Sequence, residues 1–228
     1  MKKGKIVISK NGPYLVSGNL PLGKEIAKVG KEGEPEQWVK GKHYPDQENY
    51  ALCRCGQSRK KPFCDGTHSG NGFDGTETAV RESYAEQAEK IEGPGVDLKD
   101  AQSLCAAGRF CHPKGGAWDL TLESGDPVKK ELVIQQACNC PSGRLVAYDK
   151  KTGQPIESKC PPSISLLEDP QARSSGPIWV KGGVPIESEG GKAYETRNRV
   201  TLCRCGRSKN KPFCDGSHIK IRFNGGDK

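Results

Sequence analysis

One segment of this chain occurs twice. Residues 53–68 read CRCGQSRKKPFCDGTH and residues 203–218 read CRCGRSKNKPFCDGSH, at a constant offset of 150. Between 52–68 and 202–218, 13 of 17 positions are identical. Any fold of this chain therefore has to build the same set of three cysteines and one histidine at two places. The eight residues are Cys53, Cys55, Cys64, His68, Cys203, Cys205, Cys214 and His218.

The composition limits how such sites are held together. Of 228 residues only 33% are hydrophobic and 6% aromatic, with 29 Gly and 16 Pro. We therefore expect small, turn-rich units instead of one large apolar core, each stabilised by metal or disulfides as well. No apolar run has the length of a signal peptide or a membrane span, which predicts a soluble, cytoplasmic protein. In such a reducing compartment, cysteines clustered with histidine indicate metal.

Similarity outside the ligand segments divides the chain into three units. The segment GPYLVSGNLPL from Gly12 resembles GPIWVKGGVPIES from Gly176, each predicted to be a short strand followed by a turn. The segments NYALCRC and NRVTLCRC predict a second strand that leads into each ligand loop. The predicted units are 1–78, 79–168 and 169–228. The predicted fold class is α+β, with two small β-rich units at the ends flanking a small α+β unit.

The middle unit has a different predicted order of elements. Residues 79–92, AVRESYAEQAEKIE, have helix-forming composition, and DLKDAQSLCAAGRFC starts a second helix behind an Asp cap. The segments AWDLTLE and ELVIQQ are predicted to be strands. The segment CNCPSGRLVAYD and a Pro-rich exit, CPPSISLLEDPQ, complete the unit.

Thiolate and imidazole ligands restrict the metal to zinc or an iron–sulfur cluster. Three Cys and one His fit a structural zinc site by ligand count, but zinc motifs separate paired cysteines by about two to four residues. Cysteines one residue apart point in different directions along an extended chain. A two-iron cluster offers two ligand positions on each iron, so a Cys-x-Cys pair on one iron and a more distant Cys and His on the other are natural. This chemistry favours iron–sulfur and leaves zinc open.

Both copies follow the pattern C-x-C-x2-S-x3-P-x-C-D-G-[ST]-H, which resembles that of the CDGSH (mitoNEET-like) iron–sulfur family. The resemblance implies one 2Fe-2S cluster in each copy, held by the three cysteines and the histidine of that copy. In the family the cluster-bearing unit commonly works as a two-fold pair. The two copies of this chain are therefore candidates for an internal pseudo-dimer.

Several other positions of the pattern are expected to support the cluster. Each Asp is placed to N-cap a short helix that would carry the His at its third position, and Phe63 and Phe213 are expected to shield the cluster. The polar residues expected around the ligands are Asp65, Asp215, Ser58 and Ser208. The basic residues expected to stabilise the anionic cluster are Arg54, Lys60, Lys61, Arg204, Arg207, Lys209 and Lys211.

One histidine among the thiolates has electrostatic consequences. A site with three thiolates is one unit less negative than an all-cysteine site, so we expect it to be reduced more easily than a plant-type ferredoxin. The histidine is also able to take up a proton, so the potential and the stability of the cluster are expected to depend on pH.

The middle unit resembles a divergent single-cluster bacterial ferredoxin, in which C-x2-C-x2-C is followed by a later C-P. Cys105 and Cys111 occupy the outer positions and Cys140 the last, but Gly108 stands in place of the second cysteine. Three cysteines at this spacing could hold a 3Fe-4S cluster, or a 4Fe-4S cluster completed by Cys138, Cys160 or His112. Alternatively, the unit is a metal-free scaffold whose cysteines pack as small apolar residues.

The predicted function is electron transfer or cluster transfer, with a redox partner protein or an apo-acceptor of the cluster as partner. The chain has no P-loop, dinucleotide fingerprint or nucleophile elbow, which favours a carrier over an enzyme. One alternative is a zinc-stapled basic module for nucleic acid: Lys and Arg exceed Asp and Glu at both ends (13 to 9 and 12 to 6) but not in the middle (11 to 13). The small number of aromatic residues available for base stacking argues against nucleic acid as a partner. The other alternative is a redox or iron sensor in which cluster loss opens a partner surface.

Overall fold

The computed structural model describes residues 4–226, and its strands form three sheets. The first sheet, in the order β12-β1-β2-β5, consists of β1 (Lys5–Ile8), β2 (Tyr14–Ser17), β5 (Asn49–Leu52) and β12 (Ile186–Ser188). The second, in the order β13-β11-β10-β3-β4, consists of β3 (Leu22–Val29), β4 (Pro35–His43), β10 (Ser163–Asp169), β11 (Ser174–Lys181) and β13 (Arg199–Leu202). The third, in the order β6-β7-β8-β9, consists of β6 (Glu89–Ile91), β7 (Val96–Asp100), β8 (Leu145–Asp149) and β9 (Pro155–Ile156).

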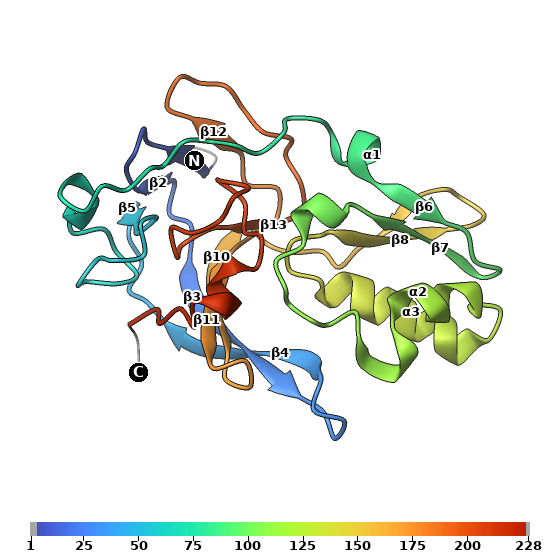
Figure 1. Ribbon diagram of the computed structural model, residues 1–228. Helices are drawn as coiled ribbons and strands as arrows, with labels where there is room; N and C mark the ends of the chain where they lie inside the picture. Colours follow the sequence, from blue (N-terminus) through green and yellow to red (C-terminus); the bar gives the residue numbers. More distant parts are fainter. Residues whose placement is uncertain (1–3, 227–228) are drawn as a thin grey trace.

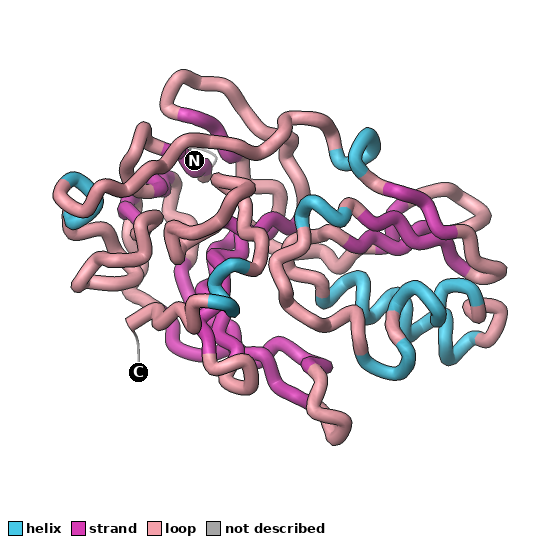
Figure 2. Tube along the Cα trace, viewed as in Figure 1, coloured by secondary structure: helices cyan, strands magenta, loops and turns pink. Residues whose placement is uncertain are grey.

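The helices are short except for one. The 3-10 turns are η1 (Thr67–Ser69), η2 (Gln102–Leu104) and η3 (Pro113–Gly115). The α-helices are α1 (Tyr84–Gln87), α2 (Ala117–Leu122), α3 (Pro127–Asn139) and α4 (Ser217–Lys220). Figure 2 shows that loops make up most of the end units, whereas α2 and α3 lie together in the middle unit. No helix within residues 4–226 is long and apolar enough to cross a membrane.

The two end units exchange strands. β12 of the second unit pairs in parallel with β1, with Ile186 opposite Ile6. β3 of the first unit pairs in parallel with β10, with Leu22 opposite Ile164. Leu22 and Ile186 occupy equivalent places in the repeated segments that start at Gly12 and Gly176, so the exchange is the same in both directions. Each unit is therefore completed by a strand of the other.

The expectation of several small separate cores is wrong for the end units. Their buried residues form one cluster that draws on both, from Ile6 to Leu52 in the first unit and from Ile164 to Leu202 in the second. The physical reason is the strand exchange, because neither unit has enough strands of its own to cover an apolar face. Figure 1 shows the two ends of the chain together on one side of the molecule and the middle unit on the other.

The predicted boundary at residue 168 also has to be corrected. It falls inside β10, so the predicted boundary places most of this strand in the middle unit. β10 pairs with β11 of the second unit and with β3 of the first, so it belongs to the sheet of the end units. A turn signal for this change of sheet was present in the sequence, since Pro161 and Pro162 stand directly before β10.

The middle unit is a small antiparallel sheet with α2 and α3 packed on one face (Figure 1). Four predicted elements were wrong. The predicted helix over 79–92 is reduced to the single turn α1 followed by β6, and the helix expected from DLKDAQ is strand β7 and turn η2. The segments AWDLTLE and ELVIQQ, predicted as strands, form α2 and α3. The start of α3 carried a missed signal, since Asp126 caps it and Pro127 occupies its first turn.

Candidate metal centres

Each ligand loop is closed on the strand that leads into it. The N–H of Cys53 donates to the carbonyl oxygen of Pro62 (2.8 Å), and the N–H of Cys64 donates to that of Ala51 (2.9 Å). The second loop repeats both bonds, at 2.8 and 3.0 Å. These bonds bring the cysteines near the start and the end of each loop together, so one strand positions both halves of a site.

The predicted ligands of each loop come together as two pairs. The Sγ atoms of Cys53 and Cys55 lie 3.8 Å apart, and the Sγ of Cys64 lies 3.3 Å from the Nδ1 of His68. The same distances are 3.7 and 3.3 Å in the second loop, between Cys203 and Cys205 and between Cys214 and His218. Within residues 4–226, no three or more His, Cys, Asp or Glu side chains form a group that could hold a single metal ion. A sulfur–sulfur pair and a sulfur–nitrogen pair fit the two irons of a 2Fe-2S cluster.

Backbone amides surround the sulfur atoms. The N–H of Gln57 lies 3.5 Å from the Sγ of Cys55, and the N–H of Gly66 lies 3.5 Å from the Sγ of Cys64. In the second loop the N–H of Gly216 lies 3.4 Å from the Sγ of Cys214. Amide donors favour the thiolate, which is the form of cysteine that binds metal.

Asp65 and Asp215 tie the tip of each loop to the turn that carries the histidine. The Asp65 carboxylate accepts from the N–H groups of Arg59 (2.8 Å) and Thr67 (3.0 Å), and Asp215 repeats both bonds at 2.8 and 2.9 Å. The predicted N-cap position was wrong by one residue. Gly66, at φ 87°, is the N-cap of η1, so the carboxylate caps from one residue further upstream and His68 is the second residue of η1.

Ser58 and Ser208 support the loops from the inside. The Oγ of Ser58 donates to the carbonyl oxygen of Phe63 (2.6 Å) and accepts from the N–H of Lys60 (3.0 Å). Ser208 makes the equivalent bonds at 2.7 and 3.0 Å. Both side chains are buried, so these hydrogen bonds are shielded from water.

Arg54 and Arg204 make hydrogen bonds that the sequence did not predict. Arg54 and Arg204 stand between paired cysteines, and the alternation of an extended chain directs them away from the sulfur atoms. Arg54 donates to the carbonyl oxygens of Ser9 and Gly75, and Arg204 donates to backbone oxygens and to Glu168 (2.9 Å). These arginines therefore fix neighbouring segments.

The phenylalanines also face the core of the end units instead of the ligands. The ring of Phe63 lies edge-on to those of Tyr44 and Tyr50, and the ring of Phe213 lies edge-on to that of Tyr194. Each Phe forms an isolated bridge to the strand before the loop, which directs its side chain to the core side.

The two ligand loops contact each other through their glycines. A Cβ added to Gly56 would lie 2.6 Å from the carbonyl oxygen of Cys205, and one added to Gly206 would lie 2.5 Å from that of Cys55. Both glycines have positive φ, 77° and 76°. Glycine is required here because each backbone approaches the ligand turn of the other copy too closely for any side chain. The contact is reciprocal, as in an isologous interface.

Burial distinguishes the two sites. Cys214 is 2% exposed and His218 is 3% exposed, whereas Cys64 and His68 are only half-buried. Burial, with the nearby Arg204 guanidinium, lowers the pKa of His218 to about 4. The imidazole is therefore neutral, which is the state that binds metal. In the Cys203–Cys205 pair, the hydrogen bond between the two side chains lowers the pKa of Cys203.

The middle unit brings its three predicted cysteines to one cavity. Cys105, Cys111 and Cys140 line a cavity of about 210 Å³, together with the arginine side chain of Arg144. A Cβ on Gly108 would lie 3.1 Å from the Cδ of Pro141, so the glycine sits where the two cysteine segments approach each other. Burial, and then the neighbouring thiols of Cys140 and Cys105, raise the pKa of Cys111 to about 12. Three thiols around one cavity fit a cluster.

The three further ligands considered for this cavity differ in position. His112 lines the cavity. Cys138 contacts the carbonyl oxygen of Ile156 at 3.7 Å, and neither it nor Cys160 belongs to the cavity wall. His43 is an exposed residue 3.8 Å from Asp46 and does not line the cavity.

Arg199 and Tyr14 lie at the sites and were not predicted. The guanidinium of Arg199, on β13, donates to the carbonyl oxygens of Ala137 (2.6 Å), Cys138 (3.0 Å) and Cys140 (2.7 Å) at the end of α3. The hydroxyl of Tyr14, on β2, donates to the carbonyl oxygen of Cys203 (2.8 Å) in the other unit. A signal was present in the sequence, because both residues differ between the two copies. Asn49 stands at the position equivalent to Arg199, and Ile178 at the position equivalent to Tyr14.

Comparison with known proteins agrees with this geometry. The family described as iron-binding zinc finger, CDGSH type, matches residues 11–69 and 175–219. The family described as divergent 4Fe-4S mono-cluster matches residues 91–150. No curated protein and no solved structure matches the chain. The chain therefore contains two CDGSH-type iron-binding domains and, between them, a divergent ferredoxin-like domain.

Proposed function

We propose that this protein is an electron carrier with one 2Fe-2S cluster in each CDGSH loop. The observation that carries the proposal is the pairing of ligands in both loops, sulfur with sulfur and sulfur with nitrogen. The cysteine pair would hold one iron, and the remaining Cys and His the other. When bound, each cluster accepts or donates one electron. The chain itself supplies the amide donors to sulfur and a neutral imidazole.

We also propose that Cys105, Cys111 and Cys140 hold a further cluster in the middle domain, with His112 as its fourth ligand. The cavity that these four residues share supports the proposal. Arg144 lies against it, held by Asp100 at 2.5 and 2.7 Å, and its cation would offset the negative charge of the thiolates.

The test is the metal content of anaerobically purified protein, with electron paramagnetic resonance before and after dithionite. Iron and acid-labile sulfide in equal amounts, with a signal that appears on reduction, would support 2Fe-2S sites. Additional iron that is lost in Cys111→Ala would support the middle cluster. A signal in the oxidised protein would indicate that this cluster is 3Fe-4S, which needs no fourth ligand at His112. Zinc without sulfide would overturn the proposal.

Cluster transfer is a second candidate for the first site alone. Cys64 and His68 are half-buried, so an acceptor protein has access to that side of the first cluster. Incubation with an apo-ferredoxin would test this function, since transfer raises the absorbance of the re-isolated acceptor. A protein that is reduced and reoxidised reversibly without loss of iron to the acceptor is an electron carrier only.

A further inference from the structure

The middle domain lies against the ligand loop of the second CDGSH site, and the first site lacks the equivalent contact. Loop 105–111, which carries Cys105 and Cys111 and is called the cysteine loop below, lies against the turn of the second site. A Cβ on Gly216 would lie 2.9 Å from the Cβ of Ala107. The position in the first loop that corresponds to Gly216 is Gly66, where an added Cβ would meet nothing within 4 Å. The same motif is therefore covered in one copy and open in the other.

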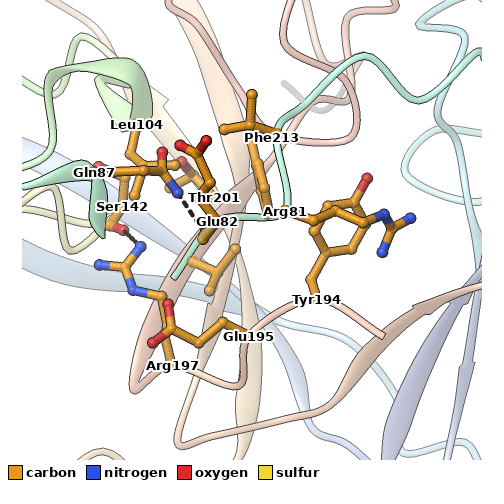
Figure 3. A pocket seen from close by; sticks show the side chains of 12 residues that line it. Arg81, Glu82, Gln87, Leu104, Ser142, Tyr194, Glu195, Arg197, Thr201 and Phe213 are labelled. Carbon is orange, nitrogen blue, oxygen red and sulfur yellow. Dashed lines mark hydrogen bonds between the residues drawn. The ribbon is translucent and has the colours of Figure 1, made fainter. Parts of the chain in front are cut away.

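Further contacts hold the middle domain against the second ligand loop. The side-chain amide of Asn210 donates to the carbonyl oxygen of Ser103 (2.9 Å), whereas Lys60, its counterpart in the first loop, is exposed. Phe213 packs against the buried cluster of the middle domain that contains Leu104. Figure 3 shows this seam, with Leu104 and Phe213 beside a small cavity and Arg197 reaching Ser142.

The cysteine loop is itself fixed to the end units by one arginine. Arg109 pairs with Asp169 (2.7 Å), at the end of β10, and bonds to Gln171 (2.9 Å). The ring of the next residue, Phe110, lies 4.5 Å from that of Trp38 on β4. These contacts fix the cysteine loop to the sheet of the end units. They thereby hold Ala107 against Gly216.

We propose that the cysteine loop is a cover that makes the two CDGSH sites unequal: the first site exchanges with partner proteins, and the second is an interior site whose histidine-bearing turn is closed off by the middle domain. This inference rests on the proposed function, because it assigns a separate role to each of the two cluster sites. It predicts that Cys64 and His68 are the ligands nearest a docked partner. It also assigns Arg109 and Asp169 a positioning role for the cover.

The test is alkylation of the metal-free full-length chain with iodoacetamide. Mass spectrometry measures the alkylation rate of each cysteine. Each rate is divided by the rate of the same cysteine in urea, which removes differences in intrinsic reactivity. We expect Cys64 to react at least about tenfold faster than Cys214, which corresponds to about 1.4 kcal/mol of opening free energy. Cys55 and Cys205 are an internal control, because they are 7% and 6% exposed and should both be protected.

Two variants then test whether the cover is the cause. Arg109→Asn and Asp169→Asn remove the same ion pair from its two sides, and Asn tolerates the positive φ of 64° at position 109. Each should speed alkylation of Cys214 and leave that of Cys64 unchanged. Lys150→Asn, which removes an ion pair of 2.8 Å to Asp97 within the middle domain, is the matched control and should change neither.

Equal normalised rates at Cys64 and Cys214 in the wild-type chain would overturn the inference. So would a Cys214 that stays protected in both ion-pair variants, because its burial would then not depend on the cover. Iron content distinguishes these results from failure of the proposed function. A chain that binds no cluster refutes that function whatever the alkylation rates are, whereas a fully loaded protein with equal rates refutes only the cover.

Discussion

The two CDGSH sites have nearly the same sequence and the same internal geometry but different surroundings. The Cys–His distance is 3.3 Å in both loops, and the Cys–Cys distance differs by only 0.1 Å (3.8 − 3.7). Yet His218 is 3% exposed while His68 is half-buried. The difference teaches that a ligand motif sets the local geometry of a site, whereas neighbouring domains set its exposure.

The largest effect is expected when one ligand is removed from each site. Cys64→Ala and Cys214→Ala should each abolish one 2Fe-2S cluster, so iron and sulfide per chain should fall equally. Unfolding temperature should fall further for Cys214→Ala, because the second site is enclosed between two domains and the lost cluster leaves buried groups there without partners. Metal analysis and thermal unfolding measure both effects. Equal losses of stability would contradict the view that only the second site is enclosed between domains.

The next effect concerns Arg199, whose guanidinium is 1% exposed and pairs with Glu157 at 2.5 Å. Arg199→Met should destabilise the protein by about 3–5 kcal/mol, since it leaves a carboxylate and the last carbonyls of α3 without their cation. Urea unfolding measures the loss. The repeat provides the control, because the equivalent Asn49 is exposed and Asn49→Ala should change stability by no more than about 0.5 kcal/mol. Similar losses of stability in the two variants would show that Arg199 does not stabilise the contact between the second end unit and the middle domain.

A smaller effect is expected at Tyr14, whose hydroxyl joins the first unit to the ligand loop of the second. Tyr14→Phe should cost about 1–3 kcal/mol, because it leaves the buried carbonyl oxygen of Cys203 with one partner fewer. It should also change the spectrum of the second cluster. Tyr50→Phe is the matched control, since that hydroxyl bonds Leu20 within the first unit (2.8 Å). A spectral change in Tyr50→Phe of the same size would count against a specific link from Tyr14.

The smallest difference between the two sites is expected at the loop serines. Ser58→Ala and Ser208→Ala each remove the same two buried hydrogen bonds, so each should cost about 1–3 kcal/mol. Chemical denaturation of both variants under identical conditions provides the comparison. A difference well outside experimental error would mean that the surroundings alter even the internal bonds of a loop.

The ligand sets could be predicted from the sequence because they are local. All four ligands of a CDGSH site lie within sixteen residues, and the hydrogen bonds that fold the loop join positions of the same short segment. The cysteines of the middle domain were also found, since their spacing resembles that of ferredoxins and the structure gathers them at one cavity. The helices α2 and α3 were missed because their apolar residues suggested strands, while the capping signal at Asp126 was overlooked.

The sequence by itself determined that this protein has two cysteine–histidine sites of one kind and a separate cysteine site between them. The tertiary structure decided that the end units share one core, that their strands are exchanged and that the second site is covered. These features depend on contacts between residues far apart in the chain, such as Ile6 with Ile186 and Ala107 with Gly216. No local pattern encodes such contacts, because any of several strands could complete an open sheet edge and only the folded arrangement selects one.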